Sequence, residues 1–122
     1  MHYIPRSKMP QVNEADLPQL VHDLVEAGLA PAFAVLDPAK LHHHQRISHI
    51  RALAMPEAIR RKPSIVSGDD YVVDGNHRTY AQKFQRELAN AIVVPRSFDE
   101  VVDFLFTLPY VYEIHHDTPI QN

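Results

Sequence analysis

The sequence contains no cysteine among its 122 residues. This absence excludes disulfide bonds, thiolate zinc sites and cysteine nucleophiles, and it is compatible with a reducing compartment. The chain also lacks an apolar run of the ~20 residues that cross a bilayer, and its best candidate, AGLAPAFAVL, is interrupted by Pro31. The first ten residues, MHYIPRSKMP, lack the apolar core of a secretory signal. We therefore expect a cytoplasmic protein with no membrane partner.

An excess of positive charge is also absent. The chain has 12 Lys and Arg against 15 Asp and Glu, a formal net charge of -3 at pH 7. Proteins that bind DNA or anionic lipid broadly usually present a basic surface. The net acidity therefore weighs against nucleic acid as a partner, and any anion site must be local.

The length and composition predict one folded domain. A chain of this length can bury a real core, and 45% hydrophobic with 22% charged residues is typical of globular proteins. We expect a single domain over residues 1–122, with an N-terminal arm at 1–12 and a C-terminal tail at 109–122.

Capping signals predict helices on both sides of the centre of the chain. Asp16 and Gln19 have the spacing of a capping box, as do Ser97 and Glu100. Ser48 is a third cap, and its helix should break at Pro56 because proline lacks the N–H that a helix needs. Three helical regions follow from these signals.

Short β-branched segments predict the strands. AFAVL (32–36) has the pattern of a buried strand and is followed by a loop over 37–46. SIVS and YVVD flank Gly68 and Asp69 like the arms of a hairpin, and AIVV (91–94) forms a further strand after a helix over 76–88. This mixed order of helices and strands indicates a compact α+β domain.

The segment between the hairpin and that helix, DGNHR, carries more polar groups than a turn needs. If Asn76 is the helix cap, the next three residues have N–H groups with no partner inside the helix. Such groups and the helix dipole attract an anion, Gly75 lets a ligand approach the backbone, and Arg78 offers a planar fork for phosphate oxygens. The turn therefore predicts a phosphate site.

The same residues also have plain structural interpretations. His77 precedes Ala81 by four positions, which places it on the apolar stripe of the helix as a satisfied core histidine. Arg78 falls on the polar face, where a solvated arginine is the default, and Asp74 can brace the turn. Spacing alone leaves these alternatives open.

The stretch KPSIVSGDDYVVDGNHRTYAQKF resembles the core of the ParB/sulfiredoxin superfamily, in which a strand, a hairpin and a Gly-x-His-Arg turn precede a helix. The similarity covers residues 60 to 95 well and extends loosely back to Leu36. It implies a small mixed sheet with a central hairpin and flanking helices. It also implies a nucleotide phosphate site, because sulfiredoxins bind ATP, ParB proteins bind CTP and the free-serine kinases bind ATP or ADP.

The resemblance assigns roles to single residues. Gly75, His77 and Arg78 would bind phosphate, with Asn76 and Thr79 beside them, and Asp74 and His77 are the candidate catalytic residues. Asn76 stands where sulfiredoxin has its catalytic cysteine, which excludes sulfinic acid reduction. The His-Glu pair that provides an acid in the serine kinases reads His44-Gln45 here, and glutamine cannot act as a general base.

We therefore expect a protein that binds a nucleoside triphosphate, ATP or CTP, with Mg²⁺ and catalyses phosphoryl transfer or hydrolysis if it is an enzyme. A ParB-like nucleic-acid-binding protein or nuclease is the alternative. A third hypothesis is a non-enzymatic module that docks partners through FDEVVDFLFTL and the aromatic tail, and a homodimer is open.

Two further clusters have weaker functional interpretations. The run His42 to His44 invites a metal, joined by His115, His116 and Asp117 only if the tail folds back, but consecutive side chains diverge and a solvated loop is favoured. The basic run 60–62 can contact a phosphate, although cations that complement the end of a helix explain it more simply.

Overall fold

The predicted strands join one mixed sheet in the computed structural model, which describes residues 4–113. The order across the sheet is β1-β5-β3-β4-β2. The strands are β1 (Ala32–Leu36), β2 (His42–His43), β3 (Ser64–Ser67), β4 (Tyr71–Asp74) and β5 (Ala89–Val94). β1 with β5 and β3 with β4 are antiparallel, whereas β3 with β5 and β2 with β4 are parallel. The predicted α+β class and central hairpin are confirmed.

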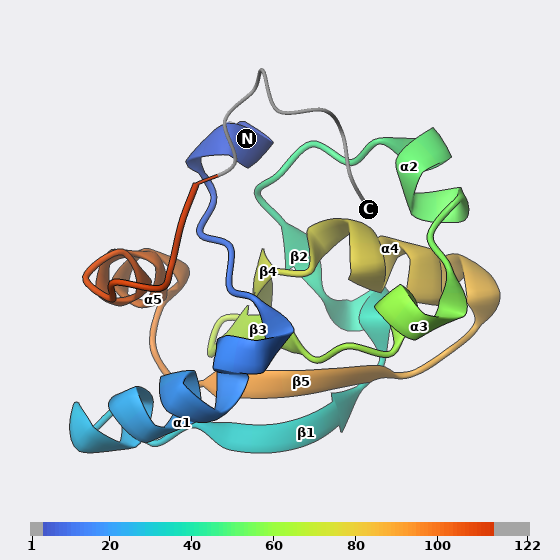
Figure 1. Ribbon diagram of the computed structural model, residues 1–122. Coiled ribbons are helices and arrows are strands. Elements are labelled where there is room, and N and C mark those ends of the chain that lie inside the picture. The colour runs from blue at the N-terminus through green and yellow to red at the C-terminus, as the bar shows by residue number, and fades with distance from the viewer. Residues whose placement is uncertain (1–3, 114–122) are drawn as a thin grey trace.

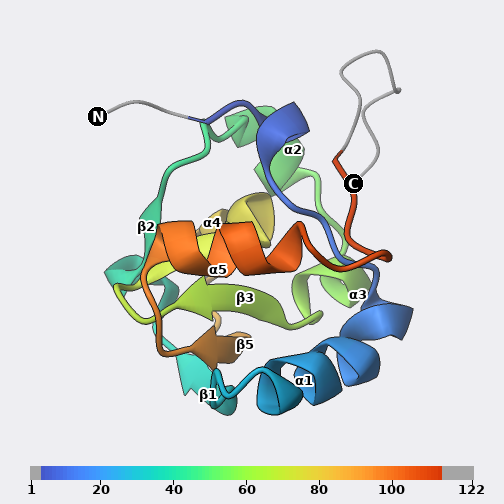
Figure 2. The same ribbon diagram turned by 90° about the vertical axis from the view of Figure 1, so that its left-hand side faces the viewer.

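Helices flank both faces of this sheet (Figure 1). They are α1 (Leu17–Glu26), α2 (His49–Leu53), α3 (Glu57–Arg60), α4 (Asn76–Gln85) and α5 (Phe98–Leu105), with 3-10 turns η1 (Arg6–Lys8), η2 (Glu14–Asp16) and η3 (Pro38–Lys40). Figure 2 shows α5 in front of β3 and α4 behind the sheet. The helix that begins at the DGNHR turn therefore lies on the face of the sheet opposite α5 (Figure 2), and α2, α3 and η3 pack against it.

The apolar residues divide between these layers. The main core lies between the sheet and the helices α1 and α5, and it includes Leu20, Leu24, Ile65, Val73, Ile92, Phe98, Val101 and Leu105. A second cluster, Leu41, Val66, Val72 and Ala91, lies on the other face of the sheet, and Ala52, Met55 and Ala81 join α2 to α4. Burial of these groups anchors both ends of the hairpin and the start of α4.

Of the caps predicted at Asp16, Ser48 and Ser97, the two serine caps form and the Asp16 cap does not. Ser97 accepts the Glu100 N–H and Ser48 accepts the Arg51 N–H, each at 3.3 Å. The capping box at Asp16 is wrong, because Gln19 instead donates to Asp23 at 2.9 Å and the Asp16 side chain accepts no capping bond. The cause is η2, which leaves Asp16 in a helical conformation (φ -92°, ψ -4°) rather than the extended one that a capping side chain needs.

The prediction of a buried strand at AFAVL is also wrong. Phe33 is 74% exposed and Val35 is 63% exposed. The residues do form β1, but β1 is an edge strand that pairs with β5 alone among the described residues. Composition indicates a strand, whereas its place in the sheet decides burial. The predicted loop at 37–46 also differs, because it contains η3 and β2.

The N-terminal arm is packed onto the domain. Ile4 bridges Gln45, Gln11 bridges Tyr112, and Met9 is fully buried. The arm therefore forms part of the wall around the start of α4. The tail residues His115, His116 and Asp117 lie outside the described residues, as does the rest of 114–122.

Within residues 4–113, no helix has the length and apolarity that crossing a membrane requires.

Candidate functional site

The junction between β4 and α4 turns on Gly75. Its backbone is left-handed (φ +102°), and it is the N-cap of α4, whose first bond within the helix runs from the Thr79 N–H to the Gly75 carbonyl at 2.9 Å. The prediction that Asn76 caps the helix is therefore wrong. Asn76 is already helical, and its side chain is only 3% exposed because it turns inward to bond with His43 and Gln45.

Glycine is required at position 75 by packing. A Cβ atom there would overlap Ser64 Oγ and lie 2.7 Å from Arg78 Nη1. The left-handed conformation adds strain for any other residue. The close approach to the backbone predicted for a ligand is thus made by the protein's own β3 and α4 side chains.

Arg78 clamps the segment between α3 and β3. Its Nε donates to the Ile59 carbonyl at 3.1 Å, and its Nη1 donates to the Pro63 carbonyl at 2.9 Å and to Ser64 Oγ at 3.3 Å. Burial lowers the pKa of this guanidinium, while the negative charges of Asp74 and Glu14 act in the opposite direction. Arg78 is therefore not the solvated arginine that its position on the helix suggested.

His77 belongs to a chain of buried polar side chains. Its Nε2 accepts the Ser48 N–H at 2.9 Å, and its Nδ1 lies 3.3 Å from Gln45 Nε2. Gln45 contacts Asn76 at 3.3 Å, and Asn76 contacts His43 Nδ1 at 2.7 Å. Burial lowers the pKa of His43, which the Asn76 bond partly offsets. Of the two alternatives for His77, the satisfied buried histidine fits this geometry.

The remaining candidates at the turn are Asp74 and Thr79. Asp74 Oδ2 accepts the Val12 N–H at 3.0 Å and so pins the N-terminal arm across the end of β4. Thr79 is fully buried and donates its hydroxyl to the Asn76 carbonyl at 3.1 Å. Asp74 thus braces the turn against the N-terminal arm, and Thr79 stabilises the first turn of α4.

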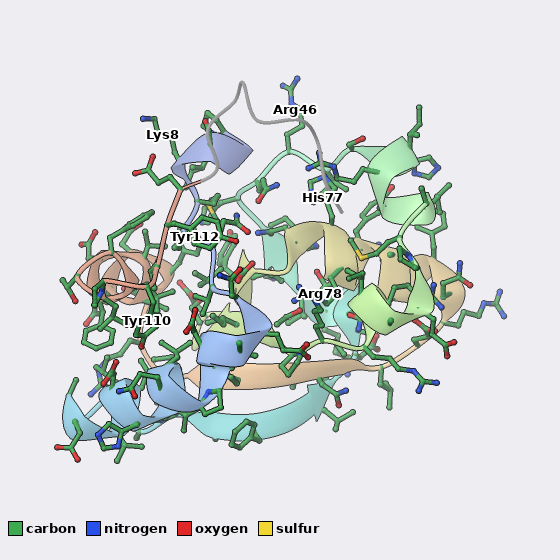
Figure 3. All side chains as sticks on the ribbon, in the orientation of Figure 1. Lys8, Arg46, His77, Arg78, Tyr110 and Tyr112 are labelled. Carbon is green, nitrogen blue, oxygen red and sulfur yellow. The ribbon has the colours of Figure 1, made fainter. Side chains whose placement is uncertain are left out.

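A small cavity of about 80 Å³ opens at this turn. It is lined by Gln11, Gln45, Arg51, Met55, Ile59, Asp74, Gly75, Asn76, His77 and Arg78. Figure 3 shows His77 and Arg78 leaving the start of α4 in different directions. The sequence brings its predicted residues to one place, since Asp74 to Arg78 all line the cavity, whereas Thr79 does not.

Sequence reasoning missed Arg51. This arginine of α2 is only 9% exposed and lines the cavity opposite the DGNHR turn. Its one signal is an arginine among Ile50, Ala52 and Leu53 in the helix HIRAL, where no pattern distinguishes it from a surface residue. The structure therefore gives the cavity a second guanidinium in addition to Arg78.

Two larger hollows adjoin the cavity. One of about 140 Å³ shares Gln11, Ile59, Asp74 and Arg78 with it, and adds Lys62 and Tyr112 among others. Another of about 520 Å³ lies beyond the Gln45 side chain and is lined by residues that include His42, His43, Arg46, Tyr80 and Lys83. The polar chain from His43 to His77 separates this second hollow from the cavity.

The histidine run does not form a metal site in the part of the chain that the structure describes. His44 stacks on Tyr71 with ring centroids 4.0 Å apart, while His43 bonds to Asn76. Over residues 4–113, no group of three His, Cys, Asp or Glu side chains is placed to hold an ion. In the basic run, Arg60 pairs with Glu87 and Arg61 with Glu57, whereas Lys62 lines the hollow of about 140 Å³.

Comparison with known proteins adds no assignment. No family model, curated protein or solved structure matches this chain.

Proposed function

We propose that the chain binds a nucleoside triphosphate through its phosphates in the cavity at the start of α4. The observation that carries this proposal is the convergence of two largely buried guanidinium groups, Arg51 and Arg78, on the first turn of a helix. The N–H groups and dipole of that turn favour an anion, and desolvated guanidinium groups strengthen the preference. A phosphate supplies the opposing charge.

The sizes of the cavities support this ligand class. The cavity of about 80 Å³ suits a phosphate group rather than a whole nucleotide. The adjoining hollow of about 140 Å³ offers the Tyr112 ring and the Lys62 ammonium to the rest of the ligand. Tyr112 donates to Asn13 at 3.0 Å, which holds its ring at the edge of this hollow.

The ParB/sulfiredoxin resemblance supports the same site. The hairpin of β3 and β4, the Gly-Asn-His-Arg turn and α4 follow one another as that superfamily requires. We therefore propose a ParB/sulfiredoxin-like domain. The phosphate-binding role that the resemblance implies for Arg78 is altered in this chain. In this chain its fork holds the Ile59 and Pro63 carbonyls, and we assign a phosphate contact to Arg51 as well.

Asp74 fits a role with Mg²⁺. The ion usually keeps several waters and binds one or two carboxylates together with the phosphates of its nucleotide. Asp74 brings a carboxylate to both cavities, and Mg²⁺ would neutralise phosphate charge there. His77 is engaged by Ser48 and Gln45, so we assign it a positioning role and leave Asp74 as the candidate to orient a water or acceptor for phosphoryl transfer.

Thermal shift with Arg51→Gln tests the proposal. Wild type, Arg51→Gln and the control Arg61→Gln, whose side chain is 76% exposed and does not line either cavity, are melted with ATP, CTP, ADP, GTP or short DNA, with and without Mg²⁺. A ligand at ~100 times its dissociation constant adds about 2.7 kcal/mol, a shift of several degrees. We expect one nucleotide to stabilise wild type and Arg61→Gln, and Arg51→Gln to lose this shift relative to its own ligand-free midpoint.

Two results would contradict it. A wild-type midpoint that no nucleotide moves removes the ligand class, and an undiminished shift in Arg51→Gln removes the site. A shift by DNA alone that falls steeply with salt would point to contacts with several phosphates of a nucleic acid.

A further inference from the structure

The edge strand β1 leaves its outer side open. Among the described residues it pairs only with β5. Proteins usually blunt such an edge with charge, proline or a very short strand, because unpaired N–H and C=O groups accept a further strand. The opposite edge follows this rule, since β2 has two residues and both are histidines. β1 has five residues, AFAVL, with neither charge nor proline.

The exposed apolar side chains of β1 share one face of the sheet. Phe33 lies across from Ile92 and Val35 across from Asn90, so both point to the face that α1 covers only in part. Their exposures, 74% and 63%, are among the highest of the large apolar residues. They border a shallow hollow of about 380 Å³ whose other walls are Pro63, Asn90 and neighbouring alanines.

We propose that β1 pairs with β1 of a second copy of this chain, which joins the two sheets into one. A two-fold axis through Ala34 gives an antiparallel register in which Phe33 lies beside Val35 of the partner subunit. The two Ala34 residues meet at the axis.

A second copy suits this edge because the strand complements itself. In the antiparallel register each exposed aromatic ring packs beside a β-branched side chain, a favourable cross-strand pair. The nearest charge, Asp37, falls opposite Pro31 of the partner subunit, so no like charges meet. A closed two-fold contact also uses up both open edges and does not continue into a fibre.

The contact between the two β1 strands is small, so the dimer it forms should be weak. A five-residue strand and its side chains fall short of the ~800 Å² that each partner buries in a standard interface. The dimer should therefore dissociate on dilution rather than form an obligate unit. The measurement must accordingly span a wide range of protein concentration.

Sedimentation velocity on the full chain tests the dimer with two matched valine substitutions. Val35→Lys places a charge in the contact, whereas Val25→Lys places one on α1 at a similarly exposed valine (58%). For wild type and Val25→Lys, we expect the weight-average mass to rise with concentration from the monomer value towards twice that value. Val35→Lys should remain at the monomer value throughout.

Hydrogen exchange on wild type gives an independent answer if Val35→Lys fails to fold. The amides of 32–36 should become more protected as concentration rises, while those of 42–43 should not change. A wild-type chain that stays monomeric at every concentration, a Val35→Lys variant that dimerises like wild type, or growth beyond the dimer would each overturn the proposal. If β1 instead pairs with a strand of another protein, the purified wild-type chain would stay monomeric at every concentration.

Discussion

Gly75 and Gly28 have similar backbones but different surroundings, and this makes them a matched pair. Both have positive φ, +102° and +75°, yet a Cβ at Gly28 meets nothing within 4 Å. Gly28→Ala should therefore cost only the left-handed strain, about 1–2 kcal/mol. Gly75→Ala should lose about 1–3 kcal/mol more, since it must also displace Ser64 and Arg78. Urea denaturation measures both, and equal losses would show that position 75 has room.

The hydrogen bonds of Arg78 predict a second loss of stability at the residue scale. Arg78→Lys keeps the charge but removes the planar fork that reaches Ile59, Pro63 and Ser64 together. A buried carbonyl that loses its donor costs about 1–3 kcal/mol, so we expect unfolding to become easier by about 2 kcal/mol. The exposed Arg61→Lys should change the free energy of unfolding by less than about 0.5 kcal/mol. Comparable urea midpoints for the two variants would argue against the clamp.

The polar chain between β2, α4 and the start of α2 predicts a pH dependence at the scale of elements. Burial lowers the pKa of His43 below its ordinary value of 6.5, so the unfolded chain takes up this proton more readily than the folded one. Stability from this group is complete well above pH 6.5 and declines as the pH falls from there towards the lowered pKa.

Urea denaturation near neutral pH and in mild acid checks this direction. Wild type should lose stability in acid, and His43→Gln, which keeps a polar side chain without a titrating ring, should lose less. The difference between the two isolates His43 from the eight other histidines. Identical pH profiles would mean that His43 titrates alike in both states.

Local signals predicted the elements better than their environments. The Ser48 and Ser97 caps, the break at Pro56 and the hairpin of β3 and β4 depend on neighbouring residues, and all of them form. The exposure of AFAVL and the role of Arg51 depend on partners distant in sequence, which no window of residues contains. At the candidate site, the residue types of Asp74 to Arg78 were informative, whereas the inward turn of Asn76 required the positions of His43 and Gln45.

At the scale of the whole molecule, the sheet lies between the main apolar core and the candidate site. The face under α1 and α5 carries most of the apolar core, and α4 on the other face carries the polar groups of the candidate site. The edge strand β1 lies at the far end of the strand order from β2, beside which the histidine-lined hollow opens. The proposed dimerisation through β1 and the proposed nucleotide binding at α4 can therefore be tested separately, because a variant that disrupts one should leave the other unchanged.

The pairing of β1 also bears on how the chain is made. Leu36 pairs with Ala89 and Ala32 with Val93, partners separated by 89 - 36 = 53 and 93 - 32 = 61 positions. During synthesis the AFAVL segment therefore leaves the ribosome well before the strand that shelters it. Contacts so distant in sequence form slowly, and an unpaired apolar strand is prone to aggregate while it waits. A nascent chain that stalls before β5 would present this segment to chaperones, and so the order of synthesis itself makes β1 the vulnerable part of the protein.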